Sequence, residues 1–218
     1  MLVGERMSRQ PITIRQDTSI DEALKIMRDE KVRRLPVFNR RDVLVGIVSE
    51  KDLLLASPSP ATSLSIYELH YLLAKMTVSE VMTRDVITVT EYTPLEEAAR
   101  IMVDNKIGGL PVMRDDKLVG IITETDLFKI FIELLGAREP GVRVTMLVPE
   151  QPGVLAQISN EIANMGGNIV ALGTFLGEDP TNALLTIKVQ DVEEKNLVKA
   201  MEPLAMEIVD VRMCEECR

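Results

Sequence analysis

The sequence of 218 residues lacks Trp and contains only four Phe and three Tyr, so its core is expected to consist of aliphatic side chains and Met. Two Cys are too few to build a secreted fold held by disulfides. No run of about 18 uncharged apolar residues occurs, and the first ten residues lack the apolar stretch of a targeting segment. We therefore expect a cytoplasmic protein without a membrane partner.

Positive charge and catalytic residue types are also scarce. The net charge of −9 disfavours a nucleic-acid partner, because the phosphate backbone is itself negative. His70 is the sole histidine and has no nearby Ser or Cys partner for a catalytic triad. Cys214 and Cys217 supply half of a four-thiolate zinc site, and no helix start lies beside them to activate a thiol. We expect no metal and no enzymatic activity, and thiol redox chemistry remains a distant third hypothesis.

The most informative feature is an internal duplication, in which Val3–Leu53 recurs as Val78–Leu127. At an offset of 75 the matched pairs include Val3/Val78, Met7/Met82, Ile12/Ile87, Ala23/Ala98, Met27/Met102 and Pro36/Pro111. After one deletion the pairing continues at an offset of 74 with Val45/Val119, Gly46/Gly120, Glu50/Glu124 and Asp52/Asp126. Two copies of one unit predict a shared cleft between them, where ligands bind.

Each copy is expected to run strand, helix, strand, strand, helix. Thr18 and Thr93 are the expected caps of the first helices, and β-branched residues predict strands at 12–14 and 87–89, before those helices. The predicted organisation is repeat 1 at 1–60, a connecting helix at 61–76, repeat 2 at 77–135 and a Gly- and Pro-containing linker at 136–141.

The pattern changes in the remaining region, 142–218. Alternating apolar residues from Val142 predict a strand, and Leu155, Ile158, Ile162 and Met165 follow at helical spacing. Two further strands, a helix and a last strand give the order βαββαβ. The fold class is therefore α+β, ending in a ferredoxin-like domain with a four-stranded antiparallel sheet and two helices on one face.

A hydroxyl residue and an Asp three positions later recur at the start of the last helix of each repeat, as Ser49/Asp52 and Thr123/Asp126. A helix N-terminus attracts phosphate, and a carboxylate accepts hydrogen bonds from ribose hydroxyls. The pattern thus fits a nucleoside phosphate. The alternative is a plain capping box, which needs no ligand.

These motifs, with Leu35-Pro36-Val37 and Leu110-Pro111-Val112 before them, resemble a tandem pair of cystathionine-β-synthase-type (CBS) domains, a Bateman module. The resemblance covers residues 1 to about 135 and implies binding of AMP, ADP, ATP, S-adenosylmethionine or NAD between the repeats. By that resemblance Asp52 and Asp126 hold ribose, Ser49 and Thr123 contact sugar or phosphate, and Ile12-Thr13 and Ile87-Thr88 border adenine.

Arg33 and Arg34 stand where nucleotide-sensing members of this family have phosphate-binding basic residues, whereas repeat 2 has Gly108 and Gly109 at the same places. The resemblance therefore implies one cationic end of a single cleft, in which the two acids hold the sugar and the two arginines neutralise the phosphate. The alternative is that both arginines are solvated at a helix end.

The C-terminal region resembles an ACT domain, a regulatory fold that commonly binds amino acids at a dimer interface. That resemblance implies a ligand loop with Glu150, Gly153, Val154 and Leu155, followed by Asn168 and Ile169 on the next strand. Dimerisation without a ligand is the equal alternative for this domain.

The order of two CBS repeats and an ACT domain resembles the AcuB family of acetoin-utilisation accessory proteins. It implies a non-enzymatic regulator that binds an adenosine nucleotide, pairs as a homodimer through both modules and controls a client enzyme. The alternative is an assembly protein with an empty cleft that regulates a partner enzyme by protein contact.

Overall fold

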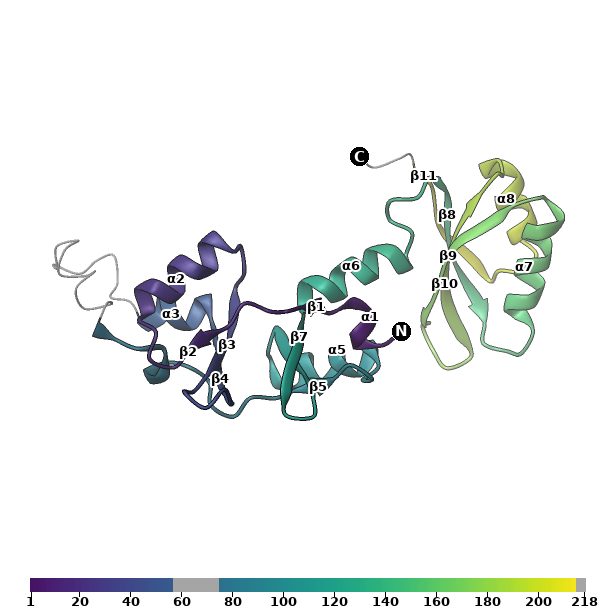
Figure 1. The fold of residues 1–218 in the computed structure, drawn as a ribbon. Helices are drawn as coiled ribbons and strands as arrows, with labels where there is room; N and C mark the ends of the chain where they lie inside the picture. The colour runs from purple at the N-terminus through teal and green to yellow at the C-terminus, as the bar shows by residue number, and fades with distance from the viewer. Residues whose placement is uncertain (57–74, 215–218) are drawn as a thin grey trace. The chain divides into compact units, whose positions relative to one another are not determined.

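The computed structural model describes residues 1–56 and 75–214, and the chain divides into two compact units, Met1–Leu127 and Phe128–Arg218 (Figure 1). His70, Cys217 and most of the expected connecting helix lie outside the described residues.

The first unit contains the two repeats as two small sheets, each with helices packed against it (Figure 1). Repeat 1 contains β2 (Ile14–Arg15), α2 (Ile20–Asp29), β3 (Arg34–Phe38), β4 (Leu44–Ser49) and α3 (Glu50–Ala56). Repeat 2 contains β5 (Val89–Thr90), α5 (Leu95–Asn105), β6 (Gly109–Arg114), β7 (Lys117–Thr123) and α6 (Glu124–Leu134). The predicted order of elements is confirmed for both copies.

The first helix of each repeat begins one residue later than predicted. Ser19 caps α2, and its side chain accepts the Glu22 N–H at 3.2 Å. Pro94 precedes α5, while the Thr93 hydroxyl accepts the Thr90 N–H at 3.1 Å within the preceding turn. Thr18 and Thr93 are therefore not the caps, because the turn after each strand extends by one residue.

The strands before these helices are also shorter and later than predicted, at Ile14–Arg15 and Val89–Thr90. Ile12, Thr13, Ile87 and Thr88 thus precede the strands as irregular chain. This leaves them outside the regular hydrogen-bonded ladder.

The two repeats exchange their leading segments, a feature that the sequence did not indicate. The segment with α1 (Val3–Arg6) and β1 (Ser8–Arg9) lies on repeat 2, where Ser8 pairs antiparallel with Ile121 of β7 (Figure 1). Correspondingly, Thr83, after the short helix η1 (Val78–Glu80), forms an antiparallel bridge with Ile47 of β4. Neither sheet is complete without a segment that the sequence assigns to the other copy.

The exchange extends into the core. Val78 and Met82 lead into repeat 2, yet both are buried in the cluster that contains Ile20, Leu35 and Leu53 of repeat 1. Burying each such side chain stabilises the fold by about 1.5–3 kcal/mol. The two copies therefore form one cooperative unit.

Gly46 and Gly120 make room for the exchanged segments. A Cβ atom at Gly46 would meet the Met82 side chain and approach the Thr83 carbonyl oxygen to 3.1 Å. A Cβ atom at Gly120 would meet the Met7 side chain and approach the Ser8 carbonyl oxygen to 3.0 Å. Glycine is required at both positions because the backbone of the exchanged segment comes too close to leave room for a side chain.

We expect Gly46→Val and Gly120→Val each to lower the free energy of unfolding by about 1–3 kcal/mol, because the added carbons force the exchanged segment away. Denaturant unfolding of the full chain measures this. Lys117→Val, at the exposed start of β7, adds the same branched side chain to open surface and serves as control. Unchanged stability in both glycine variants would contradict the close approach.

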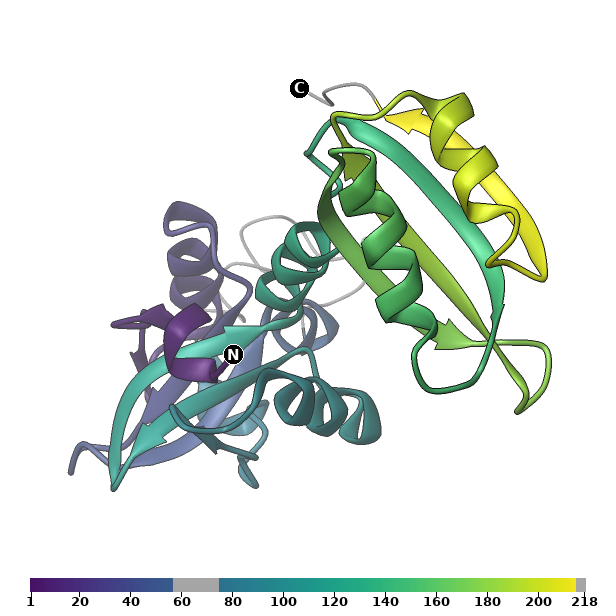
Figure 2. The same ribbon diagram turned by 90° about the vertical axis from the view of Figure 1, so that its right-hand side faces the viewer.

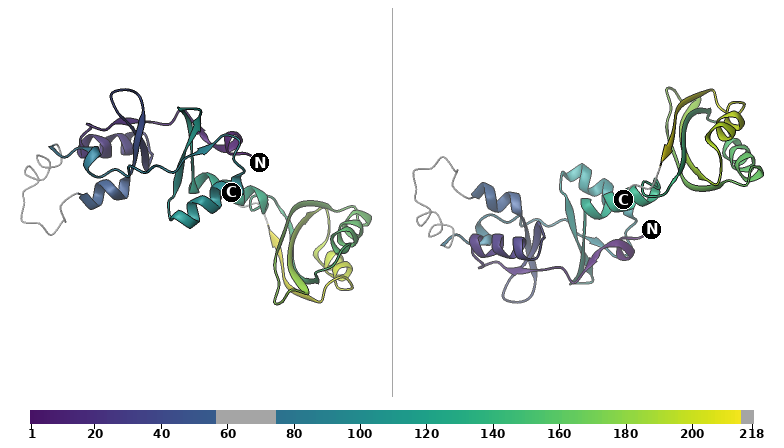
Figure 3. Two further views of the ribbon diagram at one scale, coloured as in Figure 1. Left: turned by 90° about the horizontal axis from the view of Figure 1, so that it is seen from below. Right: turned by 90° about the horizontal axis from the view of Figure 1, so that it is seen from above.

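The second unit is a four-stranded antiparallel sheet in the order β11-β8-β10-β9. Its elements are β8 (Gly141–Pro149), α7 (Val154–Asn164), β9 (Asn168–Leu176), β10 (Asn182–Gln190), α8 (Glu194–Met201) and β11 (Glu207–Cys214). Both helices cover the same face of the sheet (Figures 2 and 3). The predicted ferredoxin-like βαββαβ arrangement is confirmed.

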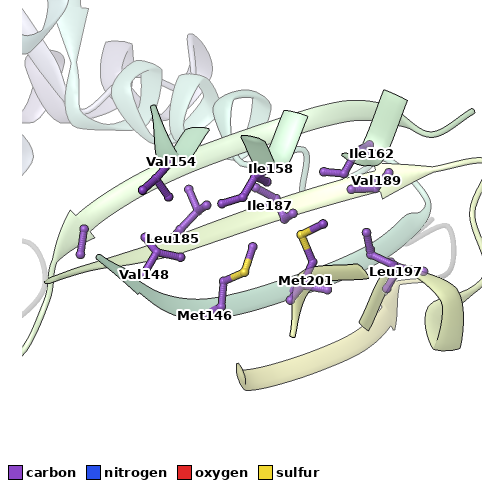
Figure 4. Close-up of a cluster of buried hydrophobic side chains, with 13 residues drawn as sticks. Met146, Val148, Val154, Ile158, Ile162, Leu185, Ile187, Val189, Leu197 and Met201 are labelled. Carbon is purple, nitrogen blue, oxygen red and sulfur yellow. The ribbon is translucent and has the colours of Figure 1, made fainter. Parts of the chain in front are cut away.

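The core of this unit lies between the sheet and the two helices. Met146, Leu185, Ile187, Ile158 and Met201 are fully buried and face one another there (Figure 4). The helix stripe differs from the predicted one at its start, because Val154 enters the core and Leu155 is 44% exposed. The helix begins at Val154 immediately after Gly153, which sets its rotation.

Candidate functional site

A pocket of about 600 Å³ lies within the first unit, beside the carboxyl ends of β4 and the start of α3. Its walls come from both repeats: β3 and the β4–α3 junction of repeat 1, the exchanged segment 83–87, and the α5–β6 turn of repeat 2. This volume lies within the range of small-molecule and cofactor sites.

The charges that line the pocket are mixed, with cations in excess. The cations are Arg33, Arg34, Lys51 and Lys106, and the carboxylates are Glu50, Asp52 and Asp85. The apolar part of the wall contains Ile47, Leu55, Val86, Ile87, Ile107 and Pro111. An apolar wall beside several cations suits a ligand with a flat ring and an anionic group.

Asp52 is held in place by the residue three positions before it. The Ser49 N–H and the Ser49 hydroxyl donate to Asp52 Oδ2 at 2.8 and 2.7 Å. The Asp52 N–H lies 3.3 Å from the Ser49 hydroxyl oxygen. One carboxylate oxygen therefore serves as the helix cap, and the other, Oδ1, accepts no bond from the described residues. The capping-box interpretation and the ribose interpretation are compatible, because they use different oxygens.

Arg34 reaches from repeat 1 to repeat 2. Its guanidinium forms an ion pair with Glu124 at the start of α6 at 3.7 Å, and its side chain is 26% exposed. A Cβ atom at Gly108 would collide with this guanidinium and with the Glu124 carboxylate. A Cβ atom at Gly109 would lie 3.0 Å from Arg34 Cδ. The glycine pair of repeat 2 thus leaves the space in which Arg34 lies.

Five of the residues predicted to bind a nucleotide line this pocket: Arg33, Arg34, Ser49, Asp52 and Ile87. Ile12, Thr13, Thr88, Thr123 and Asp126 are not among its lining residues, and Thr13 lines a separate hollow of about 640 Å³. Asp126 is thus not among the residues that line the pocket with Asp52. The exchange of segments explains this. The segment that contains Thr83 pairs with β4, which leads to Asp52, and the segment that contains Ser8 pairs with β7, which leads to Asp126.

Thr123 and Asp126 repeat the geometry of the first pair in repeat 2. The Thr123 N–H and hydroxyl donate to Asp126 Oδ2 at 3.0 and 2.7 Å. Asp52 and Asp126 therefore occupy matching positions in the two repeats. Their repeats differ nearby, because repeat 1 has Arg33 and Arg34 where repeat 2 has Gly108 and Gly109.

Sequence reasoning missed several residues of the pocket wall, notably Lys51, Lys106, Thr83 and Asp85. Lys106, the C-cap of α5, has the left-handed conformation (φ 54°), and Lys31 at the matching position, one residue after the C-cap of α2, has the same φ. Because the duplication pairs Lys31 with Lys106, the sequence did indicate that this position resembles its counterpart in the other repeat. Nothing in the residues 83–85 alone indicated that they lie on the other repeat.

The residues predicted for an ACT ligand lie at opposite ends of the sheet of the second unit. Pro149, just before Glu150, pairs with Asn182 at the start of β10, whereas Asn168 pairs with Gln190 at the end of β10. Glu150 is in the exposed loop after β8, Gly153 ends that loop with φ 95°, and Asn168 is exposed at the start of β9. A Cβ atom at Gly153 would meet nothing within 4 Å. Val154 is buried, Leu155 is exposed, and Ile169 packs partly buried against the core. The loop is open, and its first-turn amides offer donors.

In residues 1–56 and 75–214, no cluster of three or more His, Cys, Asp or Glu side chains could hold a metal ion. Nor does any helix in these described ranges have the length and apolarity needed to cross a membrane.

Comparison with known proteins identifies both units. The CBS-domain family model matches residues 3–59 and 78–133, which is more than half of the chain. The model of the acetohydroxyacid synthase (AHAS) small subunit-like ACT domain matches residues 144–212. A CBS domain-containing protein of Dictyostelium discoideum is 35% identical over 136 residues, which are 62% of this chain and 94% of that protein.

Two solved structures are similar to the first unit. The CBS domain pair of protein MJ0100, in complex with 5′-methylthioadenosine and S-adenosyl-L-methionine, is 33% identical with a TM-score of 0.50, and the match covers 60% of this chain and 95% of that one. AcuB from Vibrio cholerae is 35% identical with a TM-score of 0.51, over 64% of this chain and 96% of that one.

The chain belongs to the CBS-domain family. More specifically, it joins a tandem pair of CBS domains to an AHAS small subunit-like ACT domain, and its CBS pair resembles that of AcuB.

Proposed function

We propose that this chain is a non-enzymatic regulatory protein that senses an adenosine nucleotide in the pocket of its CBS pair. The observation that supports this most strongly is the convergence of Arg33, Arg34, Ser49, Asp52 and Ile87 on one pocket. Each of these residues was singled out from the sequence, and the spare oxygen of Asp52 lies in a wall that also carries the arginines. The adenosine compounds bound to the similar CBS pair of MJ0100 support the same ligand class.

The charge of the pocket favours a phosphorylated ligand. Arg33 and Arg34 offer charge-assisted bonds to the phosphate of AMP, ADP or ATP, or to the pyrophosphate of NAD, which the sulfonium cation of S-adenosylmethionine cannot accept. Asp52 would accept bonds from the ribose, Ser49 would keep Asp52 in position, and Ile87 would contact the adenine. Thr123 and Asp126, with Ile12, Thr13 and Thr88 on the neighbouring irregular segments, would form a second, weaker subsite without the arginine pair.

The ACT domain would assemble two chains and bind a second metabolite at the loop with Glu150 and Gly153, while Asn168 lies at the other end of the sheet. Ligand binding would act by favouring one arrangement of the assembled chains over another, which requires a difference in affinity between them. Such a protein would be cytoplasmic and would act on a client enzyme.

The second candidate is an assembly protein that works by protein contact alone. It is favoured by the apolar side chains that α6 exposes, since Phe128 is 67% exposed, Phe131 53% and Leu134 59%. Such a protein would keep its effect on a client when Asp52 and Asp126 are both replaced by Ala, whereas a sensor would lose it.

Isothermal titration calorimetry tests the sensor directly. We expect saturable heat with at least one of AMP, ADP, ATP and NAD, weaker binding of S-adenosylmethionine, and still weaker binding of adenosine. Circular dichroism before each titration establishes that the chain is folded. Folded protein that gives no heat with any of these ligands would contradict the proposal and favour the assembly protein.

A further inference from the structure

The face of the ACT sheet opposite the helices carries a buried polar cluster. Side chains alternate along β8, so Val144 and Met146 face the helices while Arg143 and Thr145 face the other way. A sheet face without helices is usually solvated, yet Thr145 is 5% exposed and Lys188 of β10 is 4% exposed. Something other than the helices therefore covers this face.

The chain between α6 and β8 provides that cover. The Lys188 ammonium donates to the carbonyl oxygens of Gly136 and Glu139, both at 2.8 Å. The Gln190 side-chain amide donates to the Pro140 carbonyl oxygen at 3.0 Å. These bonds fasten the segment 136–140 across β10. An ammonium has three N–H groups, so one N–H of Lys188 has no partner among the described residues.

A pocket of about 50 Å³ lies beside this ammonium. Lys188, Arg143 and Thr186 form its polar wall, and Leu135, Ala171 and Phe175 form its apolar wall. A site of roughly 10–15 Å³ holds one water, so this pocket has room for a larger polar group. Phe175 is 47% exposed, which leaves an approach from solvent.

The cluster around the pocket has more positive than negative charge. The two oxygens of Asp210 pair with Arg143 at 3.0 Å and with Arg212 at 2.8 Å. Lys188 contributes a third cation, and its hydrogen-bond partners among the described residues are carbonyl oxygens alone. Two arginines thus share one carboxylate, and Lys188 has no carboxylate partner among the described residues. A buried cation is stabilised by an anion that reaches it.

We propose that this pocket binds the carboxylate of a small organic acid. The Lys188 ammonium and the Arg143 guanidinium hold the carboxylate, the Thr186 hydroxyl borders it, and Leu135, Ala171 and Phe175 cover the short apolar part. The site is separate from the loop with Glu150 and Gly153, and from the nucleotide pocket of the other unit. The proposed carboxylate site can therefore be tested independently of nucleotide binding.

The test is an NMR titration of the ¹⁵N-labelled full chain with sodium formate, acetate and propionate at constant ionic strength. We expect saturable shifts of the Ala171, Gly173 and Thr186 amides, with affinity rising about fourfold for each CH₂ that becomes buried. Propionamide, which has nearly the same shape and no charge, is expected to give no saturable shift. Equal binding of propionamide or of chloride would overturn the proposal, as would shifts that never saturate.

Arg143→Gln is the informative variant, because Lys188 also fastens the segment 136–140 and its loss can disturb folding. Arg143 is partly exposed, so its replacement leaves the core intact. We expect Arg143→Gln to weaken propionate binding about tenfold or more, since a charge-assisted bond is lost. Lys199→Met removes an equal charge from the exposed side of α8 and is expected to bind as the parent does. Equal affinity of Arg143→Gln and the parent would overturn the assignment.

Discussion

Replacing Arg33 and Arg34 together by Gln is expected to weaken the binding of AMP or ATP by about a hundredfold or more while leaving the binding of adenosine unchanged. Each arginine offers a charge-assisted hydrogen bond to phosphate, worth about 1.5–3 kcal/mol. Adenosine has no phosphate and loses nothing. The measurement is the ratio of the two dissociation constants, obtained by calorimetry on the parent and the variant.

Arg40→Gln is the matched control, because Arg40 is a largely exposed arginine of the same repeat, paired with Asp17, outside the pocket. Arg40→Gln removes one positive charge, as each of the two pocket substitutions does. It should leave the affinities for AMP and for adenosine unchanged. Loss of AMP and adenosine binding to the same extent in the double variant would place the arginines in a structural role and contradict the phosphate assignment. Thermal unfolding checks the fold, since removing Arg34 frees the half-exposed Glu124.

Asp52→Ala is expected to weaken AMP and adenosine equally, by roughly 10- to 100-fold, because both ligands carry the ribose that the carboxylate accepts. The pattern is opposite to that of the arginine variant, which separates the two ligands. A second measurement uses 2′-deoxy-AMP. The parent should prefer AMP to the deoxy ligand, and Asp52→Ala should lose most of that preference.

Asp126→Ala controls for stability, because Asp126 accepts the same two bonds from Thr123 that Asp52 accepts from Ser49. Loss of such a cap costs about 0.5–2 kcal/mol in either variant. Only Asp52→Ala should affect the tighter site beside the arginines, while Asp126→Ala removes the weaker one. If both variants reduce the tighter binding equally, the two acids share one ligand and the pocket has been assigned wrongly.

The order of elements could be predicted because it depends on local periodicity and on the duplication. The helix that contains Ala23 and Met27 buries those residues, as its spacing indicated. In the second unit the predicted order βαββαβ is confirmed, because Gly and Pro mark the ends of the segments. Such signals lie within one stretch of chain and need no knowledge of distant contacts.

The exchange of leading segments could not be predicted, because β1 has two residues and no periodicity of its own. Sequence similarity assigns Met7 to repeat 1, whereas packing assigns it to repeat 2, beside Gly120. The exchange also explains why Asp126 is not among the residues that line the pocket with Asp52. Four of the five predicted residues that line the first pocket came from repeat 1 and the fifth, Ile87, from repeat 2. The remaining wall comes from parts that only the three-dimensional pairing brings together.

Arg34 and the glycine pair show a second limit. The difference between the copies was visible in the sequence, and it indicated an uneven distribution of charge. The sequence did not indicate that Arg34 lies against Gly108 and Gly109, where a side chain would collide with it. This contact is seen only in the structure with its side chains. A glycine adds nothing to a hydrophobic pattern, so its role can be inferred only from the residues that pack against it.

The exchanged segments also restrict how such a protein can have arisen. A subunit with a single copy would leave the edge of its sheet unpaired and the hollow beside its Gly46 unfilled, and it would need a second subunit to supply both. Two identical subunits would bring an arginine to each side, and the residue facing Arg34 would then collide with it. In this chain the two copies differ at these positions, so that repeat 1 carries Arg34 and repeat 2, with Gly108 and Gly109, leaves the space for it.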